Sequence, residues 1–173
     1  MIIDTHTHTF PDRIAARALA GMEKSIVDKH DWNVKIKVAG TRDALSESTK
    51  KNGVDISVVV PVATKPEQSA SINEFAAQTN EKTKETGVFS LGAIHPDNED
   101  YKDILDDIKK KGLKGIKVHP DYQKVEFDDP RYLRIFKYAD ELGLVIVTHA
   151  GEDIGLPEKI HCTPDMVLNV LNK

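Results

Sequence analysis

Cysteine is almost absent from the sequence: Cys162 is the single one among 173 residues, so no disulfide can form within the chain. This fits a reducing compartment, and because no nucleophile signature surrounds it, we expect a buried or incidental thiol. No apolar run approaches the roughly 20 residues of a membrane-spanning helix, and the first residues lack the basic-then-apolar pattern of a signal peptide. We therefore expect a cytoplasmic protein without a membrane partner.

Clusters of basic residues are also scarce. The formal net charge is −4, whereas proteins that bind nucleic acid carry basic patches. The one short basic run, residues 109–111, closes an expected helix, where it complements the negative end of the helix dipole. We therefore expect a small-molecule substrate and no nucleic-acid partner.

Strand and helix patterns alternate along most of the chain. Short apolar strands are expected at residues 2–8, 56–60, 88–95, 113–119 and 144–149, and helices at residues 11–29, 41–51, 66–86, 98–111, 130–142 and 163–172. Thr41, Asp129 and Thr163 are expected to cap three of these helices. The alternating pattern at residues 31–40 predicts a short strand or hairpin arm.

Strand–helix alternation with short connections indicates an α/β fold with a parallel sheet. The continuous apolar runs at residues 58–60 and 144–147 indicate strands that are buried on both faces. We therefore expect one domain over residues 1–173, built from about five βα units.

Two histidines, His6 and His8, end the first expected strand. Side chains two residues apart in a strand lie on one face, roughly 6.5–7 Å apart along the chain. Small tilts of the two rings bring both within about 2.0–2.1 Å of a single zinc ion. Such a pair also occurs by chance in exposed strands, so the positions of the other histidines decide the interpretation.

Five of the seven histidines fall at the carboxyl ends of expected strands: His6, His8, His95, His119 and His149. In parallel α/β folds the loops at this end surround one crevice, which carries the site. The coincidence predicts a divalent metal, with zinc expected first and Mn, Fe, Co or Ni also suited to imidazole ligands. A metal-bound water then supplies hydroxide for hydrolysis. The remaining two, His30 and His161, are expected at the surface.

Not every strand-end residue needs to bind the metal. Lys117 shares a side of its strand with His119 and could bind a substrate carboxylate, bridge two metals if carboxylated, or simply reach solvent. Either His95 or His119 could orient the substrate by a hydrogen bond. Asp4 shares the side of the first strand that carries the His pair, and it is either a second-shell partner or a turn cap.

The segments 3–8, 92–96, 115–120, 128–130 and 147–151 together resemble the amidohydrolase superfamily, specifically its amidohydrolase 2 branch. The resemblance implies a (β/α)8 TIM barrel with a divalent metal at its carboxyl face. It implies that His6, His8 and His149 are metal ligands. It also implies hydrolysis of an amide, ester or lactone bond or, in some relatives, non-oxidative decarboxylation of an aromatic acid. Lys117 lies on the strand that bears a carboxylated lysine in binuclear relatives.

The sequence departs from this family in its length. A complete barrel takes about 250 residues, and strands six to eight, with a further histidine and a metal-binding aspartate, are missing from the 173 residues. We therefore expect an incomplete barrel that forms a homo-oligomer or pairs with a missing half. No residue matches the family's general base, and Lys117 and His119 are the candidates for a catalytic role.

Two other functions remain open. A phosphoesterase or nuclease-like barrel also begins with a His-x-His strand, but the nuclease-like relatives bring a glutamate on the fourth strand, where this sequence has Lys117 and His119. The second alternative is an inactive half-barrel fragment that binds metal weakly or supports an assembly.

Overall fold

The six strands of the computed structural model, which describes residues 1–156 and 159–173, form two parallel three-stranded sheets. The first sheet contains β1 (Ile3–Thr7), β2 (Ile56–Val59) and β3 (Val88–Ser90), in that order. The second contains β4 (Gly92–Ala93), β5 (Gly115–Val118) and β6 (Val145–Thr148). The parallel sheet expected from the sequence is therefore confirmed.

The strand expected at residues 88–95 is divided into β3 and β4, which pair with different neighbours. Two asparagines of α3 (Ser69–Asn80) hold this transition. Asn80 accepts from the Ser90 amide at 2.6 Å and donates to its carbonyl at 2.9 Å. Asn73 does the same for Ala93, at 2.8 and 3.1 Å. The side chains thus satisfy backbone groups where the strand changes partners.

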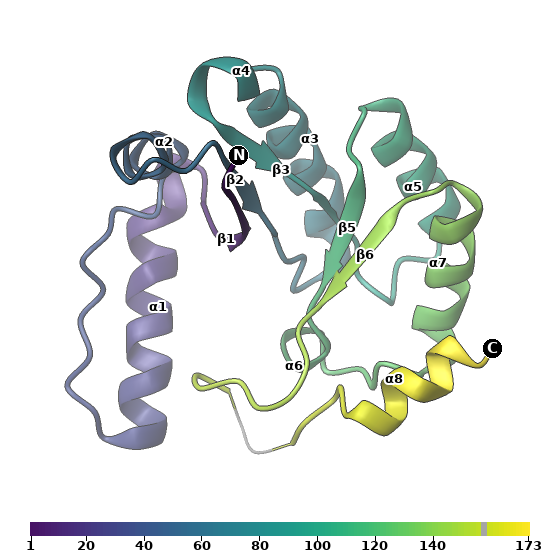
Figure 1. Cartoon of the computed structure of the whole chain (residues 1–173). Coiled ribbons are helices and arrows are strands. Elements are labelled where there is room, and N and C mark those ends of the chain that lie inside the picture. Colours follow the sequence, from purple (N-terminus) through teal and green to yellow (C-terminus); the bar gives the residue numbers. More distant parts are fainter. Residues whose placement is uncertain (157–158) are drawn as a thin grey trace.

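The helices lie along the outside of the sheets (Figure 1). They are α1 (Asp12–His30), α2 (Arg42–Lys51), α3, α4 (Thr83–Thr86), α5 (Tyr101–Lys110), α6 (Pro120–Gln123), α7 (Pro130–Glu141) and α8 (Pro164–Leu171). Thr41, Asp129 and Thr163 cap α2, α7 and α8 through their side chains, as expected. No helix among the described residues is long and apolar enough to cross a membrane.

Two expectations about local structure are wrong. Residues 31–40 contain no strand, because their backbone has no neighbouring strand to pair with; Trp32 and Val38 are left largely exposed. The helix expected at residues 66–86 is broken into a short 3-10 turn (Pro66–Gln68), α3 and α4. The break follows Asn80, whose side chain forms two hydrogen bonds with the backbone of Ser90 in the sheet.

The apolar core lies between the second sheet and the helices α5 and α7. Its members include Leu105 and Ile108 of α5, Ile116 of β5 and Ile135 of α7, all without solvent exposure. This packing makes β5 the buried centre of its sheet, and every residue of β5 is buried. Burial of such side chains is the main stabilising contribution and fixes the end of β5 in space.

The two sheets do not close into a barrel. Among the described residues, β1 and β6 each have a strand neighbour on one side only. Val145 of β6 is therefore 59% exposed, which contradicts the burial on both faces expected for residues 144–147. Burial on both faces requires structure packed against each face of the sheet.

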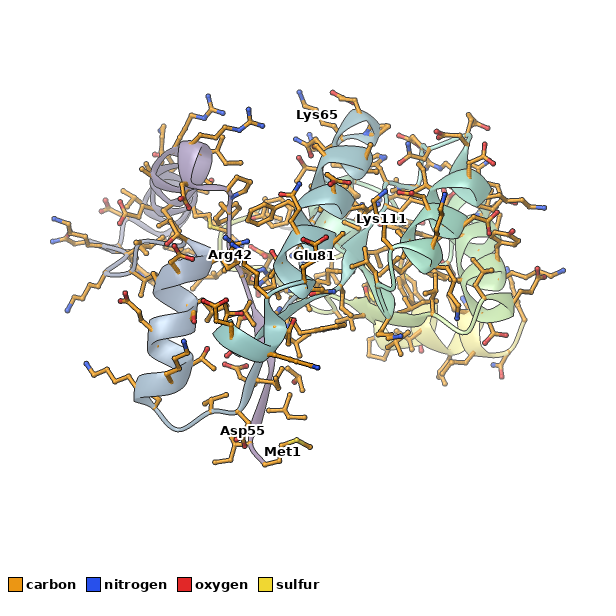
Figure 2. All side chains as sticks on the ribbon, turned by 90° about the horizontal axis from the view of Figure 1, so that it is seen from above. Met1, Arg42, Asp55, Lys65, Glu81 and Lys111 are labelled. Atoms are coloured by element: carbon orange, nitrogen blue, oxygen red, sulfur yellow. The ribbon has the colours of Figure 1, made fainter. Side chains whose placement is uncertain are left out.

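The start of β1 is fixed against β2 by Asp55. Its carboxylate accepts from the Ile2 amide at 2.5 Å and lies 3.8 Å from the Met1 amino group (Figure 2). Its own amide donates to the Ile2 carbonyl at 2.9 Å. These contacts set the register of β1, and hence which side of the strand carries the histidines.

Candidate metal centre

The ends of β5 and β6 place two histidines face to face. The His149 amide donates to the Val118 carbonyl at 3.2 Å, which extends the pairing of the two strands beyond β6. The rings of His119 and His149 stack with centroids 4.2 Å apart and planes 5° from parallel. Neighbouring parallel strands therefore bring these two side chains together, as the sequence predicts.

The tautomer of His119 is defined by a backbone contact. His119 precedes α6 as its cap, and its Nδ1 accepts from the Tyr122 amide at 3.4 Å. The proton of the neutral ring is therefore on Nε2. Burial, followed by the charge of His149, lowers the pKa of His119 to about 4, so the ring is neutral at pH 7.

Two carboxylates flank the stacked rings. Asp153, in the loop after β6, has its Oδ2 3.3 Å from His119 Nε2. Asp121, in α6, has its Oδ2 3.8 Å from His149 Nε2. His119, His149 and Asp153 each offer a potential ligand atom, and the three atoms lie within 4.8 Å of one another. Ligand atoms about 2.0–2.2 Å from a tetrahedral zinc lie about 3.3 Å apart, so modest adjustment suffices.

Three buried polar atoms at this edge lack a hydrogen-bond partner among the described residues: Lys117 Nζ, Asp121 Oδ2 and His149 Nε2. Buried polar groups in proteins are normally paired, and a carboxylate oxygen beside an imidazole nitrogen, both without such a partner, is a donor set that suits a cation. Imidazole and carboxylate are both zinc and manganese ligands. The residues present therefore fit a divalent metal.

Lys117 points from the centre of β5 and is completely buried. Burial lowers the pKa of its ammonium group to about 8. The alternative in which Lys117 reaches solvent is therefore wrong.

The His6 and His8 rings lie on one side of β1, with centroids 5.1 Å apart. Desolvation, followed by the charges of Lys117 and His149, lowers the pKa of His6. Neither His6 nor His8 belongs to the group of ligand atoms that lie within 4.8 Å of one another in the described part of the chain. Asp4 accepts from the His6 amide at 3.1 Å, so its carboxylate contacts the backbone of β1.

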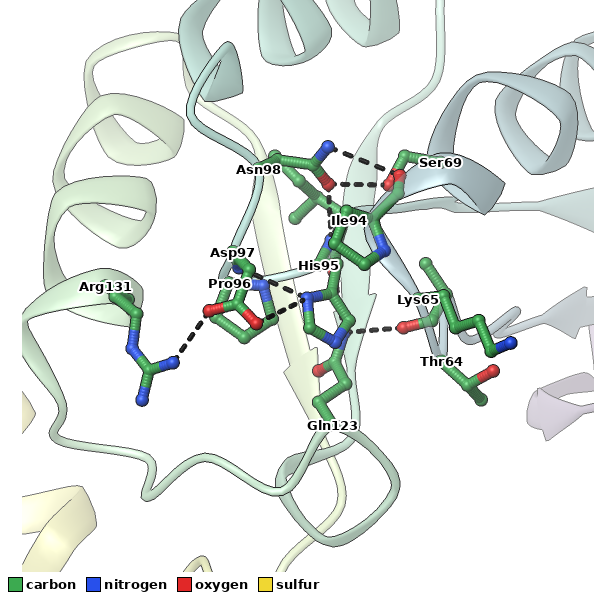
Figure 3. Close-up of polar contacts among 12 residues, drawn as sticks. Thr64, Lys65, Ser69, Ile94, His95, Pro96, Asp97, Asn98, Gln123 and Arg131 are labelled. Atoms are coloured by element: carbon green, nitrogen blue, oxygen red, sulfur yellow. Dashed lines mark hydrogen bonds and ion pairs between the residues drawn. The ribbon is translucent and has the colours of Figure 1, made fainter.

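His95 belongs to a different network (Figure 3). Its Nδ1 accepts from the Asp97 amide at 3.2 Å, and its own amide donates to Asn98 Oδ1 at 3.1 Å. Asp97 in turn accepts from Arg131 at 2.7 Å. Burial lowers the pKa of His95, which keeps the ring neutral. The structure thus places His95 within the loop after β4, apart from the converging ligand atoms.

His161 is not a surface residue, contrary to expectation. Its side chain is 15% exposed, and Asp121 Oδ1 accepts from both its amide, at 2.9 Å, and its ring Nδ1, at 2.8 Å. The contact fixes Asp121 beside His149. Asp121, Asp153 and His161 were all missed from the sequence because they come from loops or short turns that lack a periodic pattern.

Gln123 of α6 is a further residue that the sequence did not reveal. Its buried amide donates to the carbonyls of Ala63 and Ile94, both at 2.8 Å. Its oxygen accepts from the His119 amide at 2.9 Å and from the Tyr132 hydroxyl at 2.5 Å. One side chain thus links the segments that follow β2, β4 and β5, and this holds the ends of both sheets together.

Solved structures with a similar fold include three enzymes or assigned enzymes. They are a manganese-bound 5-carboxyvanillate decarboxylase from Novosphingobium aromaticivorans (15% identity, TM-score 0.63, covering 87% of this chain and 51% of that one), a putative amidohydrolase from Staphylococcus aureus (17%, 0.53, 87% and 47%), and a probable 2-pyrone-4,6-dicarboxylic acid hydrolase from Acinetobacter baumannii (14%, 0.52, 86% and 49%). The chain spans about half the length of these proteins. At such identities the likeness establishes the fold alone, which is part of a TIM barrel.

A search of curated proteins finds no significant match. The amidohydrolase family model, in contrast, matches residues 3–169. Since this match covers nearly the whole chain, the protein belongs to the amidohydrolase family.

Proposed function

We propose that the chain carries the metal-binding part of a metal-dependent hydrolase that cleaves an amide, ester or lactone bond with a metal-activated water. The observation that carries this proposal is the buried His149 Nε2, which has no hydrogen-bond partner among the described residues and lies near the carboxylates of Asp121 and Asp153 at the carboxyl ends of the strands. Perturbed ionisable groups and unpaired donors of this kind concentrate at functional sites.

In this proposal His6, His8 and His149 hold the metal. Zinc is the proposed ion, and manganese is the main alternative, because the similar decarboxylase binds manganese. When bound, the metal polarises a substrate carbonyl and lowers the pKa of its water. Neutral imidazoles are required as ligands, which agrees with the lowered pKa of His6.

Lys117 and His119 are the proposed catalytic residues. The buried ammonium group of Lys117 binds a carboxylate of the substrate, since few polar groups compete for it in this environment. The Nε2 proton of His119 lies at the same edge, 3.3 Å from Asp153 Oδ2. Asp4 acts as a support of β1, and His95 as a second-shell support of the loop after β4.

Non-oxidative decarboxylation of an aromatic acid is the second candidate. The buried Lys117 side chain suits an aromatic acid whose carboxylate is desolvated when it binds. Similar structures include 5-carboxyvanillate and 2,6-dihydroxybenzoate decarboxylases. The phosphoesterase alternative is less well supported, because β5 offers Lys117 and its end offers His119 but no glutamate.

The test is an activity panel on the purified chain, stripped with a chelator and reloaded with Zn²⁺ or Mn²⁺. We expect metal-dependent turnover of p-nitrophenyl esters or a simple lactone, and its loss in His6→Ala. Release of CO₂ from 2,6-dihydroxybenzoate without ester or lactone hydrolysis would select the decarboxylase. Hydrolysis of p-nitrophenyl phosphate alone would contradict both. Equal turnover with and without metal would contradict the metal-dependent mechanism, and absent turnover would favour the inactive fragment.

We also propose that the open edges of β1 and β6 pair with further strands, from a second copy or from another polypeptide that supplies the other half of the barrel. Ile2, Ile3 and Val145 are 60%, 45% and 59% exposed at these edges. Unpaired apolar edges favour association with another polypeptide. Light scattering coupled to size-exclusion chromatography should give a mass above 19.2 kDa; a monomer at every concentration contradicts pairing with a second copy.

A further inference from the structure

The loop after β6 holds Asp153 in one defined position. Asp153 Oδ1 accepts from the Gly155 amide at 2.8 Å, and the Asp153 carbonyl accepts from Lys29 Nζ of α1 at 3.0 Å. The Asp153 side chain is 15% exposed. The loop therefore leaves Oδ2 as the oxygen that faces the stacked histidines.

His119 is suited to orient this carboxylate and poorly suited to bind a metal itself. Its Nδ1 is an acceptor for the Tyr122 amide, so its Nε2 carries the proton. This Nε2 lies 3.3 Å from Asp153 Oδ2. A carboxylate that accepts one hydrogen bond keeps lone pairs for a metal, and such hydrogen bonds to a ligand fix its orientation.

His149 offers the complementary nitrogen. Its buried Nε2 has no hydrogen-bond partner among the described residues, and a ligand atom of Asp153 lies within 4.8 Å of its ring nitrogen. On the other side, the 5% exposed Asp121 presents an unpaired Oδ2 at 3.8 Å. Within the described part of the chain, neither carboxylate pairs with a lysine or arginine side chain, and histidine rings are their neighbours.

We propose that Asp153 is the carboxylate ligand of the metal that binds at His149, and that His119 positions Asp153 without itself binding the metal. This inference rests on the proposed metal site and adds a ligand to it. The family resemblance places the carboxylate ligand on an eighth strand, which these 173 residues lack. A ligand from the loop after β6 gives the chain a carboxylate of its own.

The experiment measures the affinity of the full 173-residue chain for Zn²⁺ and Mn²⁺ by competition with a chromophoric chelator. Asp153→Asn should weaken binding by about 100-fold, because removal of a ligand costs at least as much as removal of a supporting residue. Asp106→Asn is the matched control and should stay within a few-fold of wild type, because this exposed carboxylate of α5 accepts from the Tyr138 hydroxyl away from the site. Asp121→Asn tests the other carboxylate beside His149 and should weaken binding less than Asp153→Asn. His119→Ala should lower the metal affinity by about 10-fold. His119→Gln keeps a hydrogen-bond donor and should retain most of the wild-type affinity.

Each outcome separates this inference from the proposed metal site. If His149→Ala and His6→Ala lose the metal but Asp153→Asn keeps it, the site stands and the role of Asp153 is wrong. Loss in Asp121→Asn instead of Asp153→Asn overturns the inference as well. If His149→Ala binds like wild type, the proposed site and the inference both fail. Should Asp153→Asn not fold by circular dichroism, Asp153→Glu takes its place, and it must retain more affinity than Asp153→Ala.

Discussion

Replacing Gln123 by leucine should destabilise the fold strongly, because this one amide satisfies four groups from separate segments. The substitution leaves the carbonyls of Ala63 and Ile94, the His119 amide and the Tyr132 hydroxyl without their partner. Gln123 and Tyr132 are 4% and 0% exposed, so water has little access to replace it. A buried polar group without a partner costs roughly 1–3 kcal/mol.

Four such groups give a loss of roughly 4 kcal/mol at the lowest cost per group, a large fraction of the about 5–15 kcal/mol that stabilises a typical domain. The assay is urea unfolding followed by circular dichroism, with the free energy extrapolated to water. Gln78→Leu is the control, since Gln78 lies on exposed α3 surface and bonds only to Glu74 at 3.0 Å; it should change stability by less than about 0.5 kcal/mol. A Gln123→Leu protein within about 1 kcal/mol of wild type would refute the reasoning.

Three further changes test the fold and the site. A Cβ at Gly115 would lie 2.3 Å from a carbonyl oxygen of β6, so Gly115→Ala should lower the melting temperature by several degrees. Gly21→Ala in α1 is the control, because its added Cβ meets open space; it should stabilise the protein by up to about 1 kcal/mol. Equal melting temperatures of the two variants would be inconsistent with this packing. Lys117→Met removes a buried, unpaired amine, and urea unfolding should show a gain of roughly 1–2 kcal/mol together with loss of turnover; a less stable variant would argue against an unpaired charge. The Arg131 hydrogen bond holds the pKa of Asp129 below its usual value, so the native state gives up this proton more readily than the unfolded chain. The resulting stabilisation is present above the unfolded pKa and is lost as the pH falls through the lower native pKa. The stability difference between wild type and Asp129→Asn should therefore be larger at pH 6 than at pH 3, and a constant difference would contradict the pairing.

Periodic patterns in the sequence predicted the parts of the site that secondary structure positions. The strand–helix alternation predicted where β5 and β6 end, so the proximity of His119 and His149 could be anticipated. The caps Thr41, Asp129 and Thr163 were predicted because their side chains act on the backbone two or three residues away. Local chemistry was sufficient in each case.

Contacts between segments distant in sequence could not be predicted in this way. The pairing of Asp121 with His161 joins residues 40 positions apart, and nothing in either local sequence specifies it. The contact of Asp153 with His119 depends on a loop whose path is set by Gly155 and Lys29. These contacts determine the electrostatics of the site, so its carboxylates became apparent only from the structure.

The position of a bound metal tests the central claim most directly. A crystal of the chain grown with Zn²⁺ and measured at the zinc absorption edge should show an anomalous peak within bonding distance of His149, at the edge where the ligand atoms of His119, His149 and Asp153 converge. About 2.0–2.2 Å to an imidazole nitrogen and a carboxylate oxygen is the expected ligand geometry. A fully loaded protein whose only peak lies away from the carboxyl ends of the strands would contradict the account.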